Sequence, residues 1–187
     1  VGHGIPNLVS RFSPAEAQEP QTLERTLAQF NRYYGAHNME LTAPYAGMPE
    51  LLKKLTSAGV RLAVCSNKAD EFSQVIVAHY FPGIFEVIRG NLPGTPVKPD
   101  PGVARGILEK LNARPEETLM VGDRLYTDIA CGVNAGVDTV LVLTGEATAQ
   151  DAVKSETPPT LVCRDLGELL IRLEEAGNDV VKAVKTR

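Results

Sequence analysis

From residue 44 onward, short apolar runs alternate with stretches in which apolar residues recur at helical spacing. The runs predicted to form strands cover 60–65, 85–88, 118–121, 138–143 and 160–163. The helices predicted before, between and after them cover 48–58, 69–80, 102–111 and 166–175. Strands that are separated by helices favour a parallel sheet with right-handed crossovers and helices on both faces. The sequence therefore predicts an α/β fold with a Rossmann-like sheet.

Residues 1–43 have helical patterns and no strand signal. Leu23, Leu27, Phe30 and Tyr34 recur at the spacing of one helix face, and prolines interrupt the pattern before that stretch. The turn-like segment Pro44-Tyr-Ala-Gly marks the change to alternating strands and helices. We therefore expect two units, a small helical unit over 1–43 and an α/β core over 44–187.

Composition narrows the class of protein. The chain has 187 residues and a net charge of −4, which gives no reason to expect nucleic acid or an anionic membrane as a partner. No apolar run approaches the roughly 20 residues that span a bilayer. Three widely spaced cysteines, Cys65, Cys131 and Cys163, are typical of reduced core residues in a cytoplasmic protein. We expect a cytoplasmic protein without disulfides or a zinc site.

Two carboxylates follow the predicted strand 118–121. Asp123 comes directly after Gly122, and Asp128 lies in the turn that leads into the next helix. Ligands of open α/β sheets bind at the carboxyl ends of the strands. Two acidic groups converging there favour a cation, and oxygen ligands suit Mg²⁺. Alternatively, both residues are caps of turns and helices.

Two further loops carry polar groups at the same edge of the predicted sheet. Ser66 and Asn67 come after the strand 60–65 and before a helix, where backbone N–H groups and a hydroxyl can bind phosphate. Lys98 lies between Val97 and Pro99 on a proline-stiffened loop and can neutralise negative charge. Alternatively, Ser66-Asn67 is only a helix cap and Lys98 is only a surface lysine. Their occurrence together with the two aspartates favours a site.

These segments resemble the conserved motifs of a known superfamily. Val-Cys-Ser-Asn-Lys (64–68), Val-Lys-Pro-Asp-Pro (97–101) and Val-Gly-Asp-Arg-Leu-Tyr-Thr-Asp (121–128) resemble motifs II, III and IV of the haloacid dehalogenase (HAD) superfamily. The resemblance covers nearly the whole chain. The segment that begins Pro44-Tyr-Ala-Gly-Met-Pro looks like the phosphoglycolate phosphatase branch, in which a helical cap precedes this point.

The resemblance implies a role for each residue of these motifs. Ser66 and Asn67 would bind the phosphoryl group that is transferred, and Lys98 would stabilise its charge. Asp123 would ligate Mg²⁺, and Asp128 would either ligate it too or orient Lys98. The substrate would be a small phosphorylated metabolite, hydrolysed through an aspartyl-phosphate.

One motif of the superfamily has no counterpart. Its nucleophile lies in an Asp-x-Asp sequence after the first strand, and no Asp-x-Asp occurs in these 187 residues. In the family that strand lies between those predicted here at 60–65 and 118–121. Three arrangements are open: an N-terminal segment absent from this sequence, direct pairing of the two strands, or a strand donated by another chain in a homodimer.

Two function hypotheses follow. The first is a Mg²⁺-dependent phosphatase acting on a small phosphate monoester. The second is a non-catalytic or truncated HAD-like protein that binds phosphate or a partner without turnover. We expect the chain as it stands to keep the HAD fold and to have little or no activity.

Overall fold

The computed structural model describes residues 4–177. Residues 1–3 and 178–187, which belong to the two units predicted above, lie outside the described residues. The helices are α1 (Ile5–Phe12), α2 (Pro20–His37), α3 (Met48–Ser57), α4 (Asp70–Tyr80), α5 (Pro101–Leu111), α6 (Ala130–Ala135), α7 (Ala149–Lys154) and α8 (Leu166–Glu175). Within the described residues, no helix has the length and apolar character needed to cross a membrane.

Within residues 4–177 the strands are all parallel and form two separate sheets. In the first, β1 (Ala63–Ala69) pairs with β2 (Val87–Asn91). In the second, β4 (Asp138–Val142) lies between β3 (Leu119–Gly122) and β5 (Leu161–Cys163). The predicted parallel α/β architecture is confirmed, and every strand expected from the apolar runs is present with its ends shifted by a few residues.

Among the described residues, no strand pairing joins the two sheets. In the described part of the chain, β1 and β3 share no ladder, so direct pairing of these strands is wrong as an explanation of the missing family strand. Each of them has one neighbour, β2 or β4, and an edge facing away from that neighbour. Neighbouring strands in a continuous sheet lie about 4.8 Å apart. The architecture therefore has an interruption where the family places its first strand.

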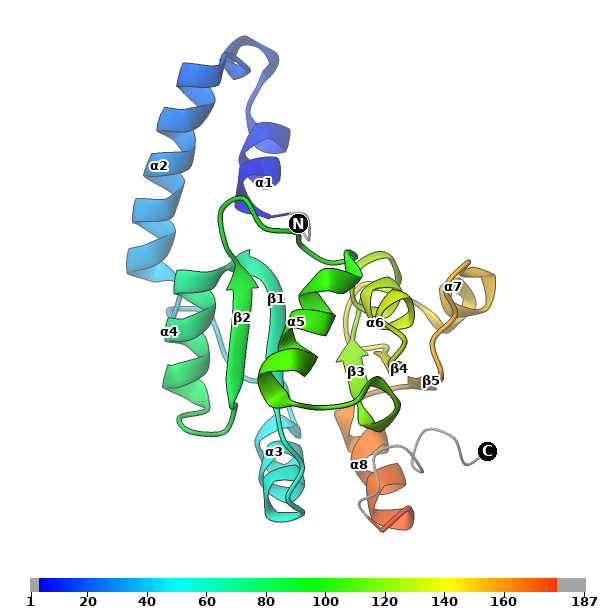
Figure 1. Ribbon diagram of the computed structural model, residues 1–187. Helices are drawn as coiled ribbons and strands as arrows, with labels where there is room; N and C mark the ends of the chain where they lie inside the picture. The colour runs from blue at the N-terminus through cyan, green and yellow to red at the C-terminus, as the bar shows by residue number, and fades with distance from the viewer. Residues whose placement is uncertain (1–3, 178–187) are drawn as a thin grey trace.

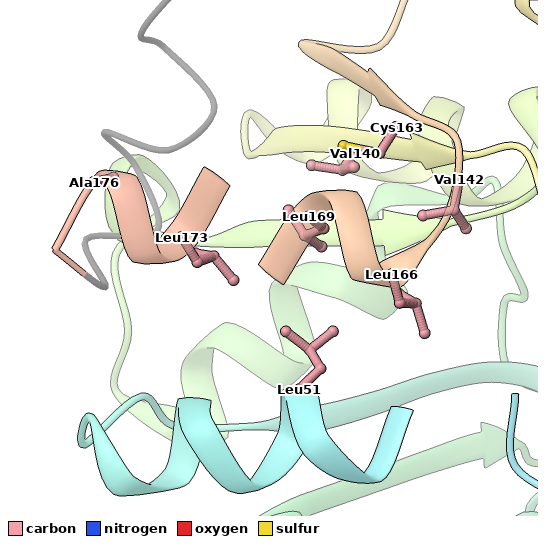
Figure 2. Packing of buried hydrophobic residues seen from close by; sticks show 8 residues of the cluster. All are labelled: Leu51, Val140, Val142, Cys163, Leu166, Leu169, Leu173 and Ala176. Atoms are coloured by element: carbon pink, nitrogen blue, oxygen red, sulfur yellow. The ribbon is translucent and has the colours of Figure 1, made fainter. Parts of the chain in front are cut away.

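Helices cover both faces of the second sheet, as the alternation along β4 requires. Val140 and Val142 point to one face, where they pack with Leu51 of α3 and with Leu169 and Leu173 of α8 (Figure 2). Leu141 points to the other face and packs among residues that precede α6 and belong to α7. Burying each such leucine contributes about 1.5–3 kcal/mol. This core fixes the ends of β3 and β4, from which the site residues emerge.

The helices α1 and α2 contact each other and stand at the end of the core toward which the strands point (Figure 1). Helix α2 carries the predicted stripe Leu23, Leu27, Phe30 and Tyr34, whose side chains are half-buried. Because the carboxyl ends of parallel strands meet at that edge, the two helices lie over the region where α/β proteins bind ligands. The division at residues 43 and 44 stays a prediction.

Local structure departs from the sequence expectation in three places. Strand β1 runs to Ala69 rather than to Cys65. Its pairing with β2 shifts register between these two residues, which leaves Ser66 to Lys68 in a bulge. The turn after β3 contains a π-helix, Leu125–Ile129, instead of an ordinary helix start. Helix α7 was not predicted, although Thr148 and Asp151 form a capping box at its start.

Candidate functional site

The bulge of β1 is held to the loop that carries Lys98. The Asn67 side chain donates to the Lys98 carbonyl over 2.9 Å and accepts from the Lys98 backbone N–H over 2.8 Å. Ser66 Oγ accepts from the Lys68 backbone N–H at 3.1 Å. The side-chain amide of Asn67 therefore positions the lysine loop, and its predicted contact with a phosphoryl group stays a prediction.

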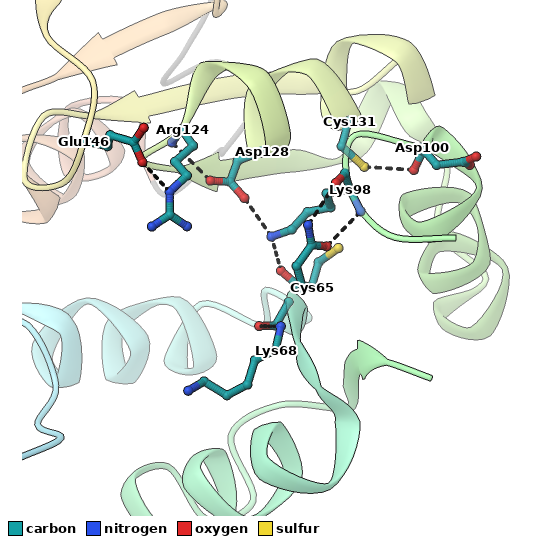
Figure 3. Close-up of polar contacts among 10 residues, drawn as sticks. Cys65, Lys68, Lys98, Asp100, Arg124, Asp128, Cys131 and Glu146 are labelled. Atoms are coloured by element: carbon teal, nitrogen blue, oxygen red, sulfur yellow. Dashed lines mark hydrogen bonds and ion pairs between the residues drawn. The ribbon is translucent and has the colours of Figure 1, made fainter. Parts of the chain in front are cut away.

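Lys98 meets Asp128 in the interior. Its ammonium donates to Asp128 Oδ1 over 2.7 Å and also to the carbonyl of Cys65 (Figure 3). The two residues are only 8% and 7% exposed. An ion pair that is removed from water in this way has little freedom to move. The contacts support the alternative in which Asp128 orients Lys98, and direct metal ligation by Asp128 stays a prediction.

The side chains of Asp123 and Asp128 each pack directly against a glycine. A Cβ built at Gly122 would lie 2.5 Å from Cγ of Asp128, and one built at Gly145 would lie 2.5 Å from Cβ of Asp123. Real Cβ atoms essentially never approach that closely. The Glu146 backbone N–H also points to Asp123 Oδ2 at 3.4 Å. The loop after β4 therefore packs against the side chain of Asp123 and fixes its position.

The same loop is hydrogen-bonded to the turn after β3. Glu146 accepts from Arg124 Nε at 2.8 Å and from the Tyr126 hydroxyl at 3.0 Å. The hydrogen bond from Arg124 holds the pKa of the Glu146 carboxyl below its ordinary value, and Tyr126 adds to that effect. Burial raises the pKa of Tyr126, and Glu146 raises it further. At neutral pH the carboxylate is ionised and paired.

The three cysteines are free thiols. Cys65 and Cys131 interact beside Lys98: the hydrogen bond from Cys131 lowers the pKa of the Cys65 thiol, and the same bond together with burial raises the pKa of Cys131. Burial also raises the pKa of the Cys163 thiol, to about 11. Cys131 and Cys163 are buried, as the sequence predicted for core residues, whereas Cys65 is half-buried. The reduced state of the three thiols stays a prediction.

A pocket of about 460 Å³ lies between the two helices α1 and α2 and the ends of the strands. All five residues expected to form the site line it. Sequence reasoning missed further lining residues, of which Lys68 and Arg124 are charged. Lys68 directly follows Ser66-Asn67 and Arg124 directly follows Asp123, so adjacency to the motifs was the available signal. The lining residues are Gly4, Ile5, Leu8, Phe30, Tyr34, Ser66, Asn67, Lys68, Lys98, Asp123, Arg124, Thr127 and Asp128.

Comparison with known proteins decides the family. The HAD-hydrolase-like family model matches residues 97–169. A pyrophosphatase, PpaX, of Halalkalibacterium halodurans is 32% identical over 153 residues, which are 81% of this chain and 70% of that protein. The chain belongs to the HAD-like hydrolase family. A phosphoglycolate phosphatase of Aquifex aeolicus is 37% identical over 65% of this chain and 57% of its own length. The HAD resemblance of the motifs is thereby confirmed.

Solved structures give the same fold. A protein of Lactobacillus delbrueckii assigned as a phosphoglycolate phosphatase has a TM-score of 0.78 and 27% identity, covering 91% of this chain and 78% of that one. Protein Tyrosine Kinase A of Mycobacterium tuberculosis has a TM-score of 0.73 and 28% identity, covering 92% and 78%. Relatives of this HAD-like chain thus carry names of different activities, and its chemistry must be argued from the site.

Proposed function

We propose that this HAD-like protein binds the phosphoryl group of a small phosphate monoester between the bulge of β1 and Lys98, and that it acts as a Mg²⁺-dependent phosphatase. The observation that carries the proposal is the buried pair of Lys98 and Asp128, which lies in one pocket with Ser66 and Asn67. Such a lysine is shielded from water and fixed in direction, so its charge acts strongly on an anion that enters the pocket.

Three residues of the pocket have a task in this proposal. Ser66 Oγ donates to a phosphoryl oxygen, and Lys98 compensates the charge on the transferring group. Asp128 keeps Lys98 aimed at that group. The bond to phosphorus is formed by the aspartate that the family resemblance places in an Asp-x-Asp motif, which these 187 residues do not contain. The ester bond opposite that aspartate breaks, the leaving oxygen takes up a proton, and water then hydrolyses the aspartyl-phosphate.

The residues present fit a magnesium ion that is held mainly by oxygen atoms of water and substrate. Among residues 4–177 there is no cluster of three or more His, Cys, Asp or Glu that could hold a metal. Asp128 is engaged by Lys98, which leaves Asp123 as the carboxylate most available to a cation. Mg²⁺ commonly binds proteins through one or two carboxylates plus substrate phosphate. When bound, it would supply a Lewis acid at the phosphoryl oxygens.

A second candidate function is phosphate binding without turnover. The carboxylates that line the pocket are Asp123 and Asp128, and each is assigned to a task other than attack on phosphorus. The sequence contains no Asp-x-Asp, and the sheet is interrupted between β1 and β3, where the family resemblance places the nucleophile. Within these 187 residues, the site therefore has groups that bind a phosphoryl group and no carboxylate left to attack it.

Hydrolysis of p-nitrophenyl phosphate separates the two functions. The chain, with its intact mass checked, is assayed with and without Mg²⁺ beside Asp123→Asn, and Glu16→Gln serves as the matched loss of an exposed carboxylate. Mg²⁺-dependent turnover that Asp123→Asn abolishes and Glu16→Gln leaves intact supports the phosphatase. Saturable phosphate binding without turnover supports the second function. Absence of both contradicts the proposal.

A further inference from the structure

Lys68 is a cation of the pocket that pairs with an aromatic side chain. It lies in the bulge of β1, and its ammonium donates to the hydroxyl of Tyr34 on α2. The ammonium also lies 4.6 Å from the centroid of the Tyr34 ring. None of the ion pairs within residues 4–177 involves Lys68. Its positive charge is therefore held in place without being neutralised by a carboxylate.

The other two cations that line the pocket each form an ion pair with a carboxylate. Lys98 pairs with Asp128 over 2.7 Å, and Arg124 pairs with Glu146 over 2.8 Å. In Figure 3 the side chains of Lys68 and Lys98 extend to the left and that of Arg124 extends downward, with the end of Lys68 set apart from the other two. All three line the pocket. Lys68 thus provides a second positive position, separate from the one at Lys98.

Tyr34 is itself fixed in place. Its ring stacks on Phe30 with centroids 5.7 Å apart and meets the edge of Phe72 of α4 at 5.1 Å. A cation held on an aromatic face keeps most of its capacity to bind an anion, because the ring carries no net charge. Tyr34 is therefore a positioning residue, which directs Lys68 into the pocket from the side of α2.

We propose that Lys68 binds a second anionic group of the substrate, a carboxylate or another phosphoryl group, while the first phosphoryl group lies at Ser66 and Lys98. The inference rests on the proposed function, because it assumes that the first group is bound there. Both positions line one pocket of about 460 Å³, so the two anionic groups belong to one small molecule. A charge-assisted hydrogen bond at Lys68 discriminates such a substrate from a monoester with an uncharged tail.

Binding of phosphonates tests this without requiring turnover. Phosphonoacetate and methylenediphosphonate carry a second anionic group, and propylphosphonate has a similar length and an uncharged end. Calorimetric titrations are made without Mg²⁺, so that chelation of the metal by these ligands does not enter. We expect phosphonoacetate, methylenediphosphonate or both to bind about tenfold tighter than propylphosphonate. That factor is the gain in affinity expected from one charge-assisted hydrogen bond. Tighter binding of phosphonoacetate would identify the second anionic group as a carboxylate. Tighter binding of methylenediphosphonate would identify it as a phosphoryl group.

Three variants assign that preference to its residues. Lys68→Met should abolish it, because it weakens the ligands with a second anionic group more than it weakens propylphosphonate. Tyr34→Phe, which keeps the ring, should reduce it by a smaller factor, because Lys68 loses its hydrogen-bond partner. Lys53→Met, at an exposed position of α3, removes the same charge outside the pocket and should preserve the preference.

The outcomes separate this inference from the function on which it rests. If all phosphonates bind equally, or if Lys68→Met keeps the preference, the role of Lys68 is refuted while the phosphate site stands. If no phosphonate and no inorganic phosphate binds, the proposed function fails and this inference fails with it.

Discussion

Lys98 Nζ lies 2.7 Å from Asp128 Oδ1, and this contact joins the two halves of an interrupted sheet. Lys98 is on a loop tied to β1 through Asn67, whereas Asp128 belongs to the π-helix after β3. Since β1 and β3 share no ladder within residues 4–177, side chains take over part of the connection that backbone hydrogen bonds make in a continuous sheet. The pair thus contributes to the fold as well as to the site.

Asp128→Asn should destabilise the protein. It leaves the Lys98 ammonium buried without its counter-charge, and breaking a buried pair in this way costs about 3 kcal/mol. Urea unfolding measures the change. The double variant Lys98→Met with Asp128→Asn removes both charges and should lose clearly less stability than the single one. Equal losses in the two variants would mean that the ion pair is not what stabilises this region.

Gly145→Ala should displace Asp123. The added methyl group would occupy the space of the Asp123 side chain, so the carboxylate must move out of its position in the pocket. We expect Mg²⁺ affinity, measured by calorimetry, to fall by about tenfold, a usual loss when the support of a metal ligand is removed. Gly106→Ala in α5 is the control, because a Cβ there meets nothing within 4 Å. Unchanged Mg²⁺ binding in Gly145→Ala would contradict the placement of the metal at Asp123.

Leu169→Ala should show how firmly α8 holds the second sheet. Leu169 is 2% exposed and packs among Leu51, Val140 and Leu173, so truncation leaves a cavity and costs about 3 kcal/mol. Ile171 lies on the same helix and is 54% exposed. Ile171→Ala should therefore cost less than about 1 kcal/mol in the same urea experiment. Similar losses at both positions would refute this orientation of α8.

The buried thiol of Cys163 predicts a loss of stability in alkaline solution. Burial raises its pKa from 9.0 to about 11, so the folded protein retains a proton that the unfolded chain releases. This contribution is complete below pH 9 and is lost as the pH rises through 11. It amounts to roughly 2–3 kcal/mol. Unfolding free energies measured across that range should fall more for the wild type than for Cys163→Ala; parallel curves would exclude the thiol as the cause.

Much of the fold followed from local pattern. Helix α8 has the bounds predicted from its periodicity, and Asp165 caps it by accepting from the Glu168 N–H at 2.9 Å. The five expected site residues line one pocket, because the carboxyl ends of parallel strands converge. Where the chain departs from regular geometry, as in the bulge after Cys65, periodicity has no signal for it.

The parts of the site that sequence reasoning missed depend on contacts between distant segments. Tyr34 meets Lys68 only because α2 docks over the end of β1, and Glu146 meets Arg124 only because the loop after β4 folds back over the turn after β3. Each of these residues also has an unremarkable surface interpretation. The interruption of the sheet likewise depends on pairing between strands, which single-strand patterns do not specify.

The most direct test of the account is a calorimetric titration of the chain with inorganic phosphate, comparing the wild type with Ser66→Ala and with the exposed control Ser57→Ala. We expect saturable binding that Ser66→Ala weakens by about tenfold through the loss of a charge-assisted hydrogen bond. Ser57→Ala should bind as the wild type does. Absence of binding in the wild type, or equal affinity in Ser66→Ala, would contradict a phosphoryl site at the end of β1.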